Sequence, residues 1–247
     1  MASSGEKKLL GKVALITGGS RGIGRAIASA FAQSGARVFI CGRNQAAVDG
    51  TVENIRGAGG EIDGGAGDIG DIADATRIVG GALERFGSID VLVNNASVLG
   101  ARVPIAEYPV DAWEEVIRVN VNGLFYVTHE VLPVMLARRS GSIINVTSGV
   151  GRTGKARWGA YAVSKAGLEG FTQVLADEVK EDGIRVNAVN PAGTRTQMRA
   201  AAYPGEDPLT LPTPAEIVPV FLYLASDVSA HITGKSLDAQ DWLGRTD

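Results

Sequence analysis

The stretch KVALITGGSRGIG, from Lys12 to Gly24, decides the fold of this 247-residue chain. Its first six residues form a compact, mainly apolar run that predicts a fully buried strand. Four glycines follow, and then a helical pattern of apolar residues at Ile27, Ala30 and Phe31. This order is the context of a dinucleotide-binding turn, because glycine lets the backbone approach a pyrophosphate and the helix N-terminus presents free N–H groups. A glycine-rich turn without a ligand is the alternative, since the spacing is G-x-x-x-G-x-G rather than G-x-G-x-x-G.

Strands and helices alternate about seven times along the chain. Further strands are predicted at 36–41, 61–66, 90–93, 142–146, 184–189 and 236–239, and further helices at 45–58, 72–86, 111–137, from 161 onward and from 213 onward. Such alternation predicts a parallel sheet covered by helices on both faces. We therefore expect an α/β, doubly wound Rossmann fold of about seven strands, in one domain over residues 1–247 with residues 1–8 disordered.

Two predicted helices begin with a capping signal. Asp111 is followed by Glu114, and Thr213 is followed by Pro214 and Glu216. In both cases a short polar side chain can accept from the first N–H groups while the acid three residues later bonds back. We therefore expect helices to begin at Asp111 and Thr213.

Composition narrows the class of protein. The formal net charge of −3 gives no reason to expect a nucleic acid partner. The chain has one cysteine, Cys41, inside an apolar run, so we interpret it as a small buried side chain in a reducing compartment. Met1 to Lys8 lacks the apolar core of a secretory signal, and no run is long enough to span a membrane. The expected location is the cytoplasm.

A second motif, Tyr161-Ala-Val-Ser-Lys165, begins a predicted helix. Residues four apart lie on one helix face, so the phenol and the ammonium can serve one site. A nearby cation lowers a tyrosine pKa, and a tyrosine tuned in this way can act as a general acid–base catalyst. Taken alone, the pair is also compatible with a buried edge beside a solvated head.

Several motifs together resemble the short-chain dehydrogenase/reductase family. They are TGGSRGIG at 17–24, NNA at 94–96, Asn120, Ser148, YxxxK at 161–165 and NPAGTRT at 190–196. The resemblance covers residues from about 10 to 240, and the motifs occur in the family's order and spacing.

The resemblance implies catalytic roles for four residues. Tyr161 is the acid–base residue, Ser148 polarises the substrate oxygen, and Lys165 holds the nicotinamide ribose and lowers the tyrosine pKa. Asn120 anchors a water in a proton relay. In this scheme hydride moves between a nicotinamide and a carbonyl or secondary alcohol, and no metal is required. Without the family, Asn120 would be interpreted as a polar kink in a helix.

The expected cofactor is NADP(H). An acidic residue after the second strand would bind the ribose 2′-OH of NAD, but Gly42 and Arg43 stand there and Arg21 lies in the glycine turn. Two guanidiniums suit a 2′-phosphate, although both could instead be solvated. The predicted cofactor-binding residues are Gly18, Ser20, Arg21, Gly22, Ile23, Gly24, Arg43, Asp68, Ile69, Asn95, Ala96, Tyr161, Lys165, Pro191, Thr194 and Thr196.

The sequence departs from the family pattern at three places. Ser97 and Ala192 replace usual glycines, and each puts a side chain beside the expected cofactor. The tail from Asp238 to Asp247 lacks the usual Gly-Gly. Trp242 in this tail is either a substrate contact or a packed anchor.

The predicted substrate end is less specific. Residues 197–213 should form a lid, and 98–102 and 149–158 the other walls. Arg102, Arg152, Lys155 and Arg157 make the rim basic, which favours an anionic substrate unless these residues are simply solvated. The open alternatives are a carbonyl reductase, a 3-oxoacyl-carrier-protein reductase whose carrier docks on Arg138-Arg139, a non-catalytic NADP(H)-binding regulator and a methyltransferase. The resemblance also implies a homo-oligomer, a tetramer or a dimer, that meets through helices 111–137 and 160–181.

Overall fold

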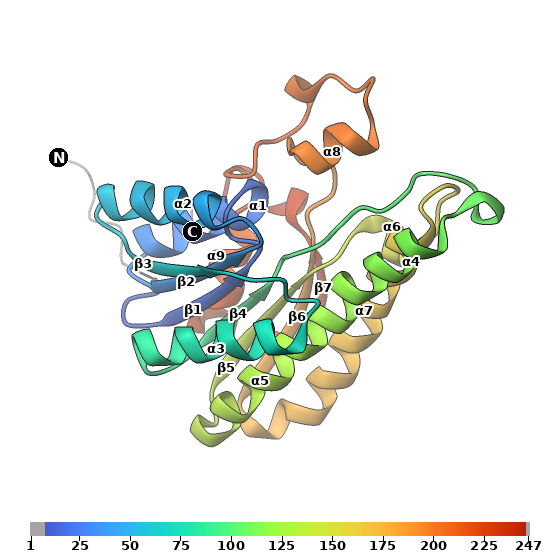
Figure 1. The fold of residues 1–247 in the computed structure, drawn as a ribbon. Helices are drawn as coiled ribbons and strands as arrows, with labels where there is room; N and C mark the ends of the chain where they lie inside the picture. The colour runs from blue at the N-terminus through green and yellow to red at the C-terminus, as the bar shows by residue number, and fades with distance from the viewer. Residues whose placement is uncertain (1–7, 246–247) are drawn as a thin grey trace.

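The computed structural model describes residues 8–245 and contains one seven-stranded parallel sheet (Figure 1). The strands are β1 (Val13–Thr17), β2 (Arg37–Gly42), β3 (Glu61–Ala66), β4 (Val91–Asn94), β5 (Gly141–Val146), β6 (Ile184–Asn190) and β7 (Ser236–Asp238). Their order is β3-β2-β1-β4-β5-β6-β7, so the winding reverses between β1 and β4. The predicted fold class is confirmed. The expectation of disorder over residues 1–8 lies outside the described residues except for Lys8, which is in a turn.

Alternation along the strands builds two cores. In β1, Ala14 and Ile16 belong to the cluster under α1, α2 and α9, whereas Val13 and Leu15 belong to the cluster under α3, α5 and α7. The helices are α1 (Gly22–Gln33), α2 (Gln45–Gly57), α3 (Ile72–Phe86), α4 (Val110–Ile117), α5 (Gly123–Arg138), α6 (Gly149–Arg152), α7 (Gly159–Val179), α8 (Gln197–Ala202) and α9 (Pro219–Ala225). Within residues 8–245, no helix has both the length and the apolar content that a bilayer crossing demands.

The two predicted helix starts differ from the structure. The helix expected at Asp111, α4, begins at Val110 with Pro109 as its N-cap. Asp111 therefore lies in the first turn, and its side chain caps no N–H group. Proline suits this end of a helix because the first N–H groups lack partners in any case. At the other start, the Thr213 N–H and hydroxyl both donate to the Glu216 carboxylate at 2.7 Å, so only one half of the predicted capping box forms. The Glu216 N–H bonds the Thr213 carbonyl instead of its hydroxyl. Turns follow this start, and the regular helix α9 begins only at Pro219.

The helix predicted at 111–137 is interrupted. A π-helical turn, η2 (Arg118–Asn122), separates α4 from α5 and contains Asn120. Such turns insert one extra residue into a helix and are frequent at functional sites. The apolar residues predicted one continuous helix here and did not indicate the extra residue.

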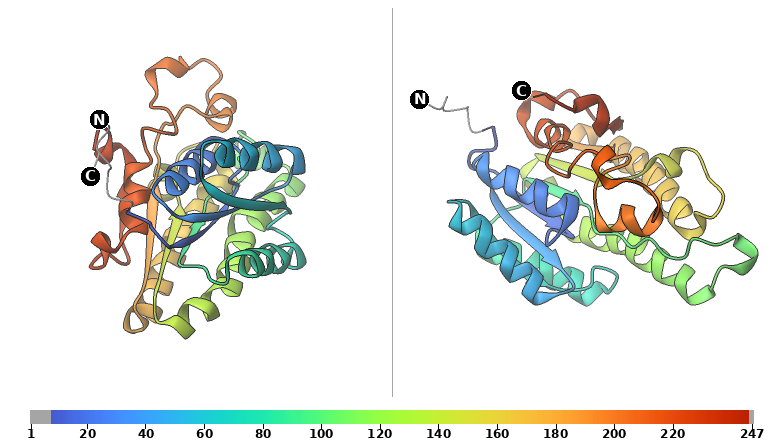
Figure 2. Two further views of the ribbon diagram at one scale, coloured as in Figure 1. Left: turned by 90° about the vertical axis from the view of Figure 1, so that its left-hand side faces the viewer. Right: turned by 90° about the horizontal axis from the view of Figure 1, so that it is seen from above.

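Residues 197–210 project from the sheet as a separate lobe (Figure 2). This lobe holds α8 and a short 3₁₀ turn, η4 (Pro208–Thr210), neither of which the sequence pattern predicted. The tail packs against α9: Trp242 lies against Tyr223, with ring centroids 4.6 Å apart. Trp242 is therefore a packed anchor rather than a substrate contact.

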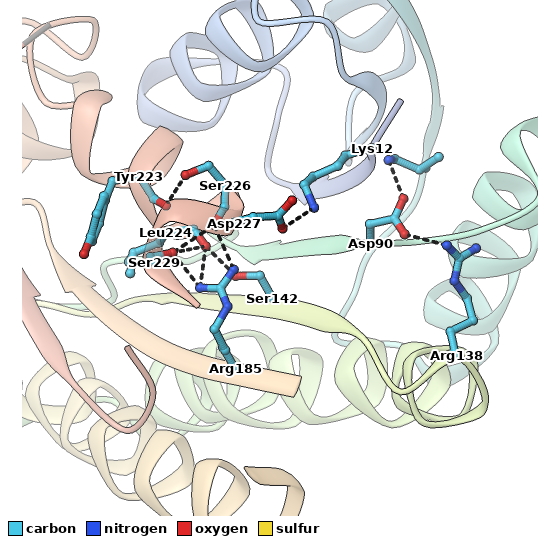
Figure 3. Close-up of polar contacts among 11 residues, drawn as sticks. Lys12, Asp90, Arg138, Ser142, Arg185, Tyr223, Leu224, Ser226, Asp227 and Ser229 are labelled. Carbon is cyan, nitrogen blue, oxygen red and sulfur yellow. Dashed lines mark hydrogen bonds and ion pairs between the residues drawn. The ribbon is translucent and has the colours of Figure 1, made fainter. Parts of the chain in front are cut away.

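The amino ends of the strands carry a network of paired polar groups (Figure 3). Arg185, at the start of β6, donates to the Leu224 carbonyl at 2.8 Å and to the Ser229 hydroxyl at 2.7 Å. Asp90 accepts from the Val13 N–H at 2.8 Å and from Arg138 at 3.0 Å. These contacts tie the sheet to the end of α9 and to the end of α5.

Candidate active site

The carboxyl ends of the strands surround a cavity of about 1470 Å³. Ligands of open α/β sheets bind at this edge, where the winding reverses. Every predicted catalytic or cofactor-binding residue lines the cavity except Gly24 and Asn120, which lie behind its wall.

The glycine turn is built for close approach. Gly18 and Gly22 have φ values of +64° and +54°, a region that favours glycine. A Cβ on Gly24 would lie 2.3 Å from the Gly18 carbonyl, so Gly24 allows α1 to pack on the turn rather than contacting a ligand. The first N–H groups of α1 have no side-chain cap, because Arg21 stands at the N-cap position and bonds none of them. The turn therefore offers free donors at a helix N-terminus, which suits a pyrophosphate.

Asn95 and Thr17 lock the glycine turn to the end of β4. The Asn95 amide donates to the Thr17 carbonyl at 2.9 Å and to the Gly18 carbonyl at 3.1 Å. The Thr17 hydroxyl accepts from the N–H groups of Asn95 at 3.0 Å and Ala96 at 3.1 Å. Asn95 thus shapes the cavity as well as lining it.

Arg21 and Arg43 lie at one end of the cavity, and both are exposed. Arg43 is 3.7 Å from Glu115, an exposed pair that contributes little stability. A Cβ on Gly42 would lie 2.6 Å from the Ser20 hydroxyl, so an acidic side chain does not fit there without displacing Ser20. This end is basic and lacks the acid that would bind a ribose 2′-OH.

Asp68 is held as a carboxylate. Burial tends to raise its pKa, but bonds from Arg118 and the Gly70 N–H outweigh this and hold the pKa below its ordinary value. The Arg118–Asp68 distance is 2.7 Å, and Arg118 also contacts Glu115 at 2.7 Å. Sequence reasoning missed Arg118 and Glu115, because nothing local links them to residues fifty positions away.

Tyr161, Ser148 and Lys165 converge on the cavity from α7 and the end of β5. The Lys165 Nζ donates to the Val146 carbonyl at 2.8 Å and lies 5.5 Å from the centre of the Tyr161 ring. Both side chains are buried, Tyr161 at 8 % and Lys165 at 2 % exposure.

Burial governs the pKa values of this pair. Burial raises the pKa of Tyr161 to about 12, against the opposing effect of the Ser97 and Ser148 hydroxyls. Burial also lowers the pKa of Lys165 to about 7. The causes of the shift at Tyr161 are burial and the two serine hydroxyls, so the expected effect of Lys165 on the tyrosine pKa stays a prediction.

Asn120 braces the cavity wall. Its carbonyl oxygen accepts from the Val98 N–H at 2.8 Å, and its amide donates to the Val98 carbonyl and the Ser164 hydroxyl, both at 3.0 Å. The side chain therefore ties the loop after β4 to α7. Its expected role as a water anchor stays a prediction.

The stretch after β6 closes another side of the cavity. The Thr194 hydroxyl donates to the Pro191 carbonyl at 2.9 Å, and Thr196 caps α8 by accepting from the Arg199 N–H at 3.1 Å. Ala192, which replaces the usual glycine, has a φ of +53°. A residue with a side chain is strained in this left-handed region of backbone conformation. Ala192 nevertheless has the conformation that glycine would adopt without strain.

The opposite end of the cavity is aromatic and apolar. Trp158 packs between Tyr161 and Tyr203 with tilted ring planes, the ring centroids lying 5.4 Å and 5.9 Å away. Leu99 and Met198 line the same end. Arg102 lies 3.9 Å over the Trp158 ring and donates to the Ala202 carbonyl at 3.3 Å, so it fastens α8 to the wall.

Several predicted basic features are already paired. Arg152 bonds both Asp238 oxygens, at 2.9 Å and 2.8 Å, so it is not a free rim charge. Arg138 pairs with Asp90 and Arg139 with Asp182, at the amino ends of the strands. The suggested carrier-protein surface at Arg138-Arg139 therefore lies at the edge opposite the cavity, and carrier docking there stays a prediction.

Other candidate groups in residues 8–245 are inert. His, Cys, Asp and Glu side chains nowhere gather there in threes as metal ligands. Cys41 lines the cavity but is buried, and burial raises the pKa of its thiol to about 12, so it stays protonated.

Comparison with known proteins agrees with this geometry. A family model described as short chain dehydrogenase matches residues 12–207. The chain belongs to the short-chain dehydrogenase family. It is 40 % identical to the uncharacterised oxidoreductase YciK of Escherichia coli over 239 residues, covering 93 % of this chain and 92 % of that protein. It is 38 % identical to a 3-oxoacyl-[acyl-carrier-protein] reductase of Thermotoga maritima, covering 92 % and 96 % of the two chains.

Solved structures give the same assignment. A short chain dehydrogenase from Escherichia coli CFT073, complexed with NADPH, superimposes with a TM-score of 0.91 at 40 % identity, covering 95 % of this chain and 99 % of that one. The family resemblance and the expectation of an oxidoreductase are thereby confirmed.

Proposed function

We propose that this chain is an NADP(H)-dependent oxidoreductase that interconverts a carbonyl compound and a secondary alcohol. One observation carries the proposal: the glycine turn with two exposed arginines and the Tyr161–Ser148–Lys165 cluster line a single cavity. A cofactor bound at the first would present its reactive ring to the second.

The chain's own residues supply position and proton transfer. When bound, the nicotinamide supplies or accepts the hydride. During reduction, Ser148 and Tyr161 donate hydrogen bonds to the substrate oxygen, and Tyr161 gives its proton as negative charge develops there. Lys165 binds the ribose hydroxyls in this scheme, and Asn120 holds the cavity wall through its bonds to Val98. Retention of all four residues argues against a non-catalytic regulator, and the lack of an acid at Gly42 argues against a methyltransferase.

NADP(H) is preferred over NAD(H) because of charge at the adenosine end. Arg21 and Arg43 are exposed there, and Arg43 has only a loose partner in Glu115. A 2′-phosphate can displace that partner and bind the guanidinium in a bidentate manner. The NADPH complex of the relative from Escherichia coli supports this assignment.

The substrate is enclosed by residues 197–213, which act as a lid. Arg195 closes the base of this segment, since its N–H donates to the Pro212 carbonyl at 2.9 Å and its guanidinium to the Leu211 carbonyl at 3.1 Å. Trp158, Leu99 and Met198 make the enclosed end apolar. The 3-oxoacyl reductase relative makes short 3-oxoacyl thioesters the first candidates, beside simple ketones.

A paired titration with NADPH and NADH tests the proposal first. Energy transfer from tryptophan to the reduced nicotinamide reports binding of either cofactor. Tighter NADPH binding is expected, followed by NADPH oxidation with acetoacetyl-N-acetylcysteamine or a ketone. Equal binding overturns the NADP preference, and binding of neither cofactor overturns the oxidoreductase assignment.

We further propose a cytoplasmic homo-oligomer, a dimer or a tetramer, which assembles through α5 and α7. Phe125 on α5 and Val163 and Val174 on α7 are exposed at 48 %, 51 % and 58 %. Apolar side chains grouped on neighbouring helices are typical of an association surface. Light scattering after gel filtration measures the state, and Val174→Glu should lower it.

A further inference from the structure

We propose that the Asn190 side chain, oriented by Asp238, positions the Ser148 hydroxyl for its bond to the substrate oxygen. Asn190 does not line the cavity, so it is a positioning residue that acts through the backbone next to Ser148. The inference rests on the proposed function, in which Ser148 bonds that oxygen. It gives a role to Asp238, where the tail that departs from the family pattern begins.

The Asn190 carbonyl oxygen holds two segments of the cavity wall. It accepts from the Gly149 N–H at 3.0 Å and from the Ala192 N–H at 2.9 Å. Gly149 directly follows Ser148, and both Ser148 and Ala192 line the cavity. Asn190 is itself buried, at 7 % exposure. One buried oxygen therefore fixes the backbone after β5 relative to the backbone after β6.

The Ser148 hydroxyl is not used to cap the helix that follows it. Ser148 stands at the N-cap position of α6, where a serine side chain usually accepts from an early N–H group of the helix. Here it caps none of them. The Gly149 N–H bonds Asn190 instead, and the Gly151 N–H bonds the Ser148 carbonyl at 2.9 Å. The start of the helix is thus satisfied without the hydroxyl that the reaction needs.

Asp238 sets the direction of the Asn190 amide. The Asp238 Oδ1 accepts from the Asn190 Nδ2 at 2.6 Å. A carboxylate can only accept, so the amide must turn its NH₂ group to Asp238 and its oxygen to the two backbone N–H groups. Without Asp238, the amide could turn over and present donors to those N–H groups.

Arg152 ties the far end of the same helix. It is the last residue of α6, and its guanidinium bonds both Asp238 oxygens, at 2.9 Å and 2.8 Å. It also donates to the Ser236 hydroxyl at 2.7 Å and lies 3.4 Å from Glu169 of α7. The helix after Ser148 is therefore held by β6 at its first residue and by β7 at its last.

The test is a double-mutant cycle on the kcat of NADPH oxidation with acetoacetyl-N-acetylcysteamine or the best ketone substrate. Ser148→Ala should lower kcat about 100-fold, as loss of a donor to developing negative charge does. Asn190→Ala should lower kcat about tenfold, because the hydroxyl remains but is misplaced. In the Ser148→Ala background, Asn190→Ala should lower kcat by less than about twofold, since no hydroxyl is left to position. A loss that persists in full in that background overturns the role, as does an unchanged kcat in Asn190→Ala.

Two further variants guard against an effect on folding alone. Asp238→Ala keeps Asn190 but frees its amide to turn, and should lower kcat about threefold in the wild type and not in Ser148→Ala. The matched control is Asn187→Ala on the same strand, where the buried side chain bonds the Ile232 carbonyl at 2.9 Å and the Lys235 N–H at 3.1 Å. Its loss should lower stability and leave the kcat of the folded protein unchanged.

Hydrogen exchange separates this inference from the proposed function. Mass spectrometry should show amide exchange of residues 147–152 about tenfold faster in Asn190→Ala than in the wild type, with residues 13–17 unchanged. Unchanged exchange at 147–152 overturns the placement of this segment by Asn190, whatever the turnover. Absence of wild-type turnover with every carbonyl and alcohol, together with the faster exchange, defeats the proposed function and with it the catalytic use of this placement.

Discussion

Buried polar groups are paired at the amino ends of the strands, but some are left unpaired at the carboxyl ends. We call these two sides of the sheet the amino edge and the carboxyl edge. At the amino edge, Arg185 and Asp90 are fully engaged with neighbouring helices and strands (Figure 3). At the carboxyl edge, buried donors and acceptors are left over. Within residues 8–245, the buried side-chain atoms without a hydrogen-bond partner are Asn94 Oδ1, Ser97 Oγ, Arg102 Nε, Trp158 Nε1 and Arg195 Nε. All of them belong to residues at the carboxyl end of β4 or in the loops around the cavity.

This contrast locates function without reference to any relative. An unpaired buried polar group lowers stability by about 1–3 kcal/mol, so most proteins have few of them. Of the three described non-glycine residues with positive φ, Ala192 and Arg157 lie at the same edge and Arg139 lies at the amino edge. The amino edge stabilises the fold, and the carboxyl edge keeps polar groups available for ligands.

The largest expected effect is at the carboxyl edge. Tyr161→Phe removes the acid–base hydroxyl and should lower kcat about 1000-fold, within the range that general acid–base catalysis contributes. NADPH affinity should stay within about twofold, and the free energy of unfolding within about 1 kcal/mol, because the ring and its contact with Trp158 are kept. Steady-state kinetics and urea unfolding measure the two quantities. Retained turnover would remove Tyr161 from the reaction.

The next largest effect is at the amino edge, where a substitution should lower stability and leave activity unchanged. Arg185→Met removes charge-assisted bonds to the Leu224 carbonyl and the Ser229 hydroxyl and should lower the free energy of unfolding by about 2–3 kcal/mol. The kcat of the folded protein should not change. Lys12→Met is the matched control, since it breaks only an exposed contact with Asp227 and should cost less than about 1 kcal/mol. A fall in kcat of folded Arg185→Met would mean that the two edges are coupled.

The sequence predicts the strands and the local motifs of the cavity better than the helix α8 that lies over the cavity. All seven strands are predicted to within a residue or so, even the weak one at Glu61–Ala66, because apolar runs and glycine turns are local signals. The glycine turn and the Tyr161–Lys165 pair were also found locally, from order and spacing. The helix α8 was missed, because its six residues lack a periodic pattern and depend on the Thr196 cap and on contacts with distant aromatic rings.

Contacts between distant segments account for the other errors. Arg152 and Arg138 pair with Asp238 and Asp90, which lie on distant segments, and their spacing in the sequence does not indicate these pairs. The pKa of Tyr161 depends on burial, which the spacing of Tyr161 and Lys165 does not report. Sequence periodicity gives the face on which a residue lies, but not the segment that will cover that face.

A smaller effect is expected at the adenosine end of the cavity. Arg43→Asp replaces a guanidinium by a carboxylate and should lower the NADPH-to-NADH affinity ratio about tenfold, because the acid repels a 2′-phosphate while Arg21 remains. Glu115→Gln is the control: it frees Arg43 from a 3.7 Å pair and should raise NADPH affinity by no more than about twofold. An unchanged ratio in Arg43→Asp would assign phosphate recognition to Arg21 alone.

The smallest effect compares strain at the two edges directly. Ala192 at the carboxyl edge and Arg139 at the amino edge have nearly equal φ values, +53° and +50°. Ala192→Gly relieves this strain and loses only a methyl group, so it should raise the free energy of unfolding by up to about 1 kcal/mol. Arg139→Gly relieves the same strain but also breaks the contact with Asp182 at 2.9 Å, so its gain should be smaller or absent. Urea unfolding of both variants gives the comparison, and NADPH titration of Ala192→Gly shows what the methyl group does. A stability gain with weaker NADPH binding would mean that the strained alanine is kept because its methyl group contacts the cofactor. A stability gain with unchanged NADPH binding would mean that the strain at this edge has no function.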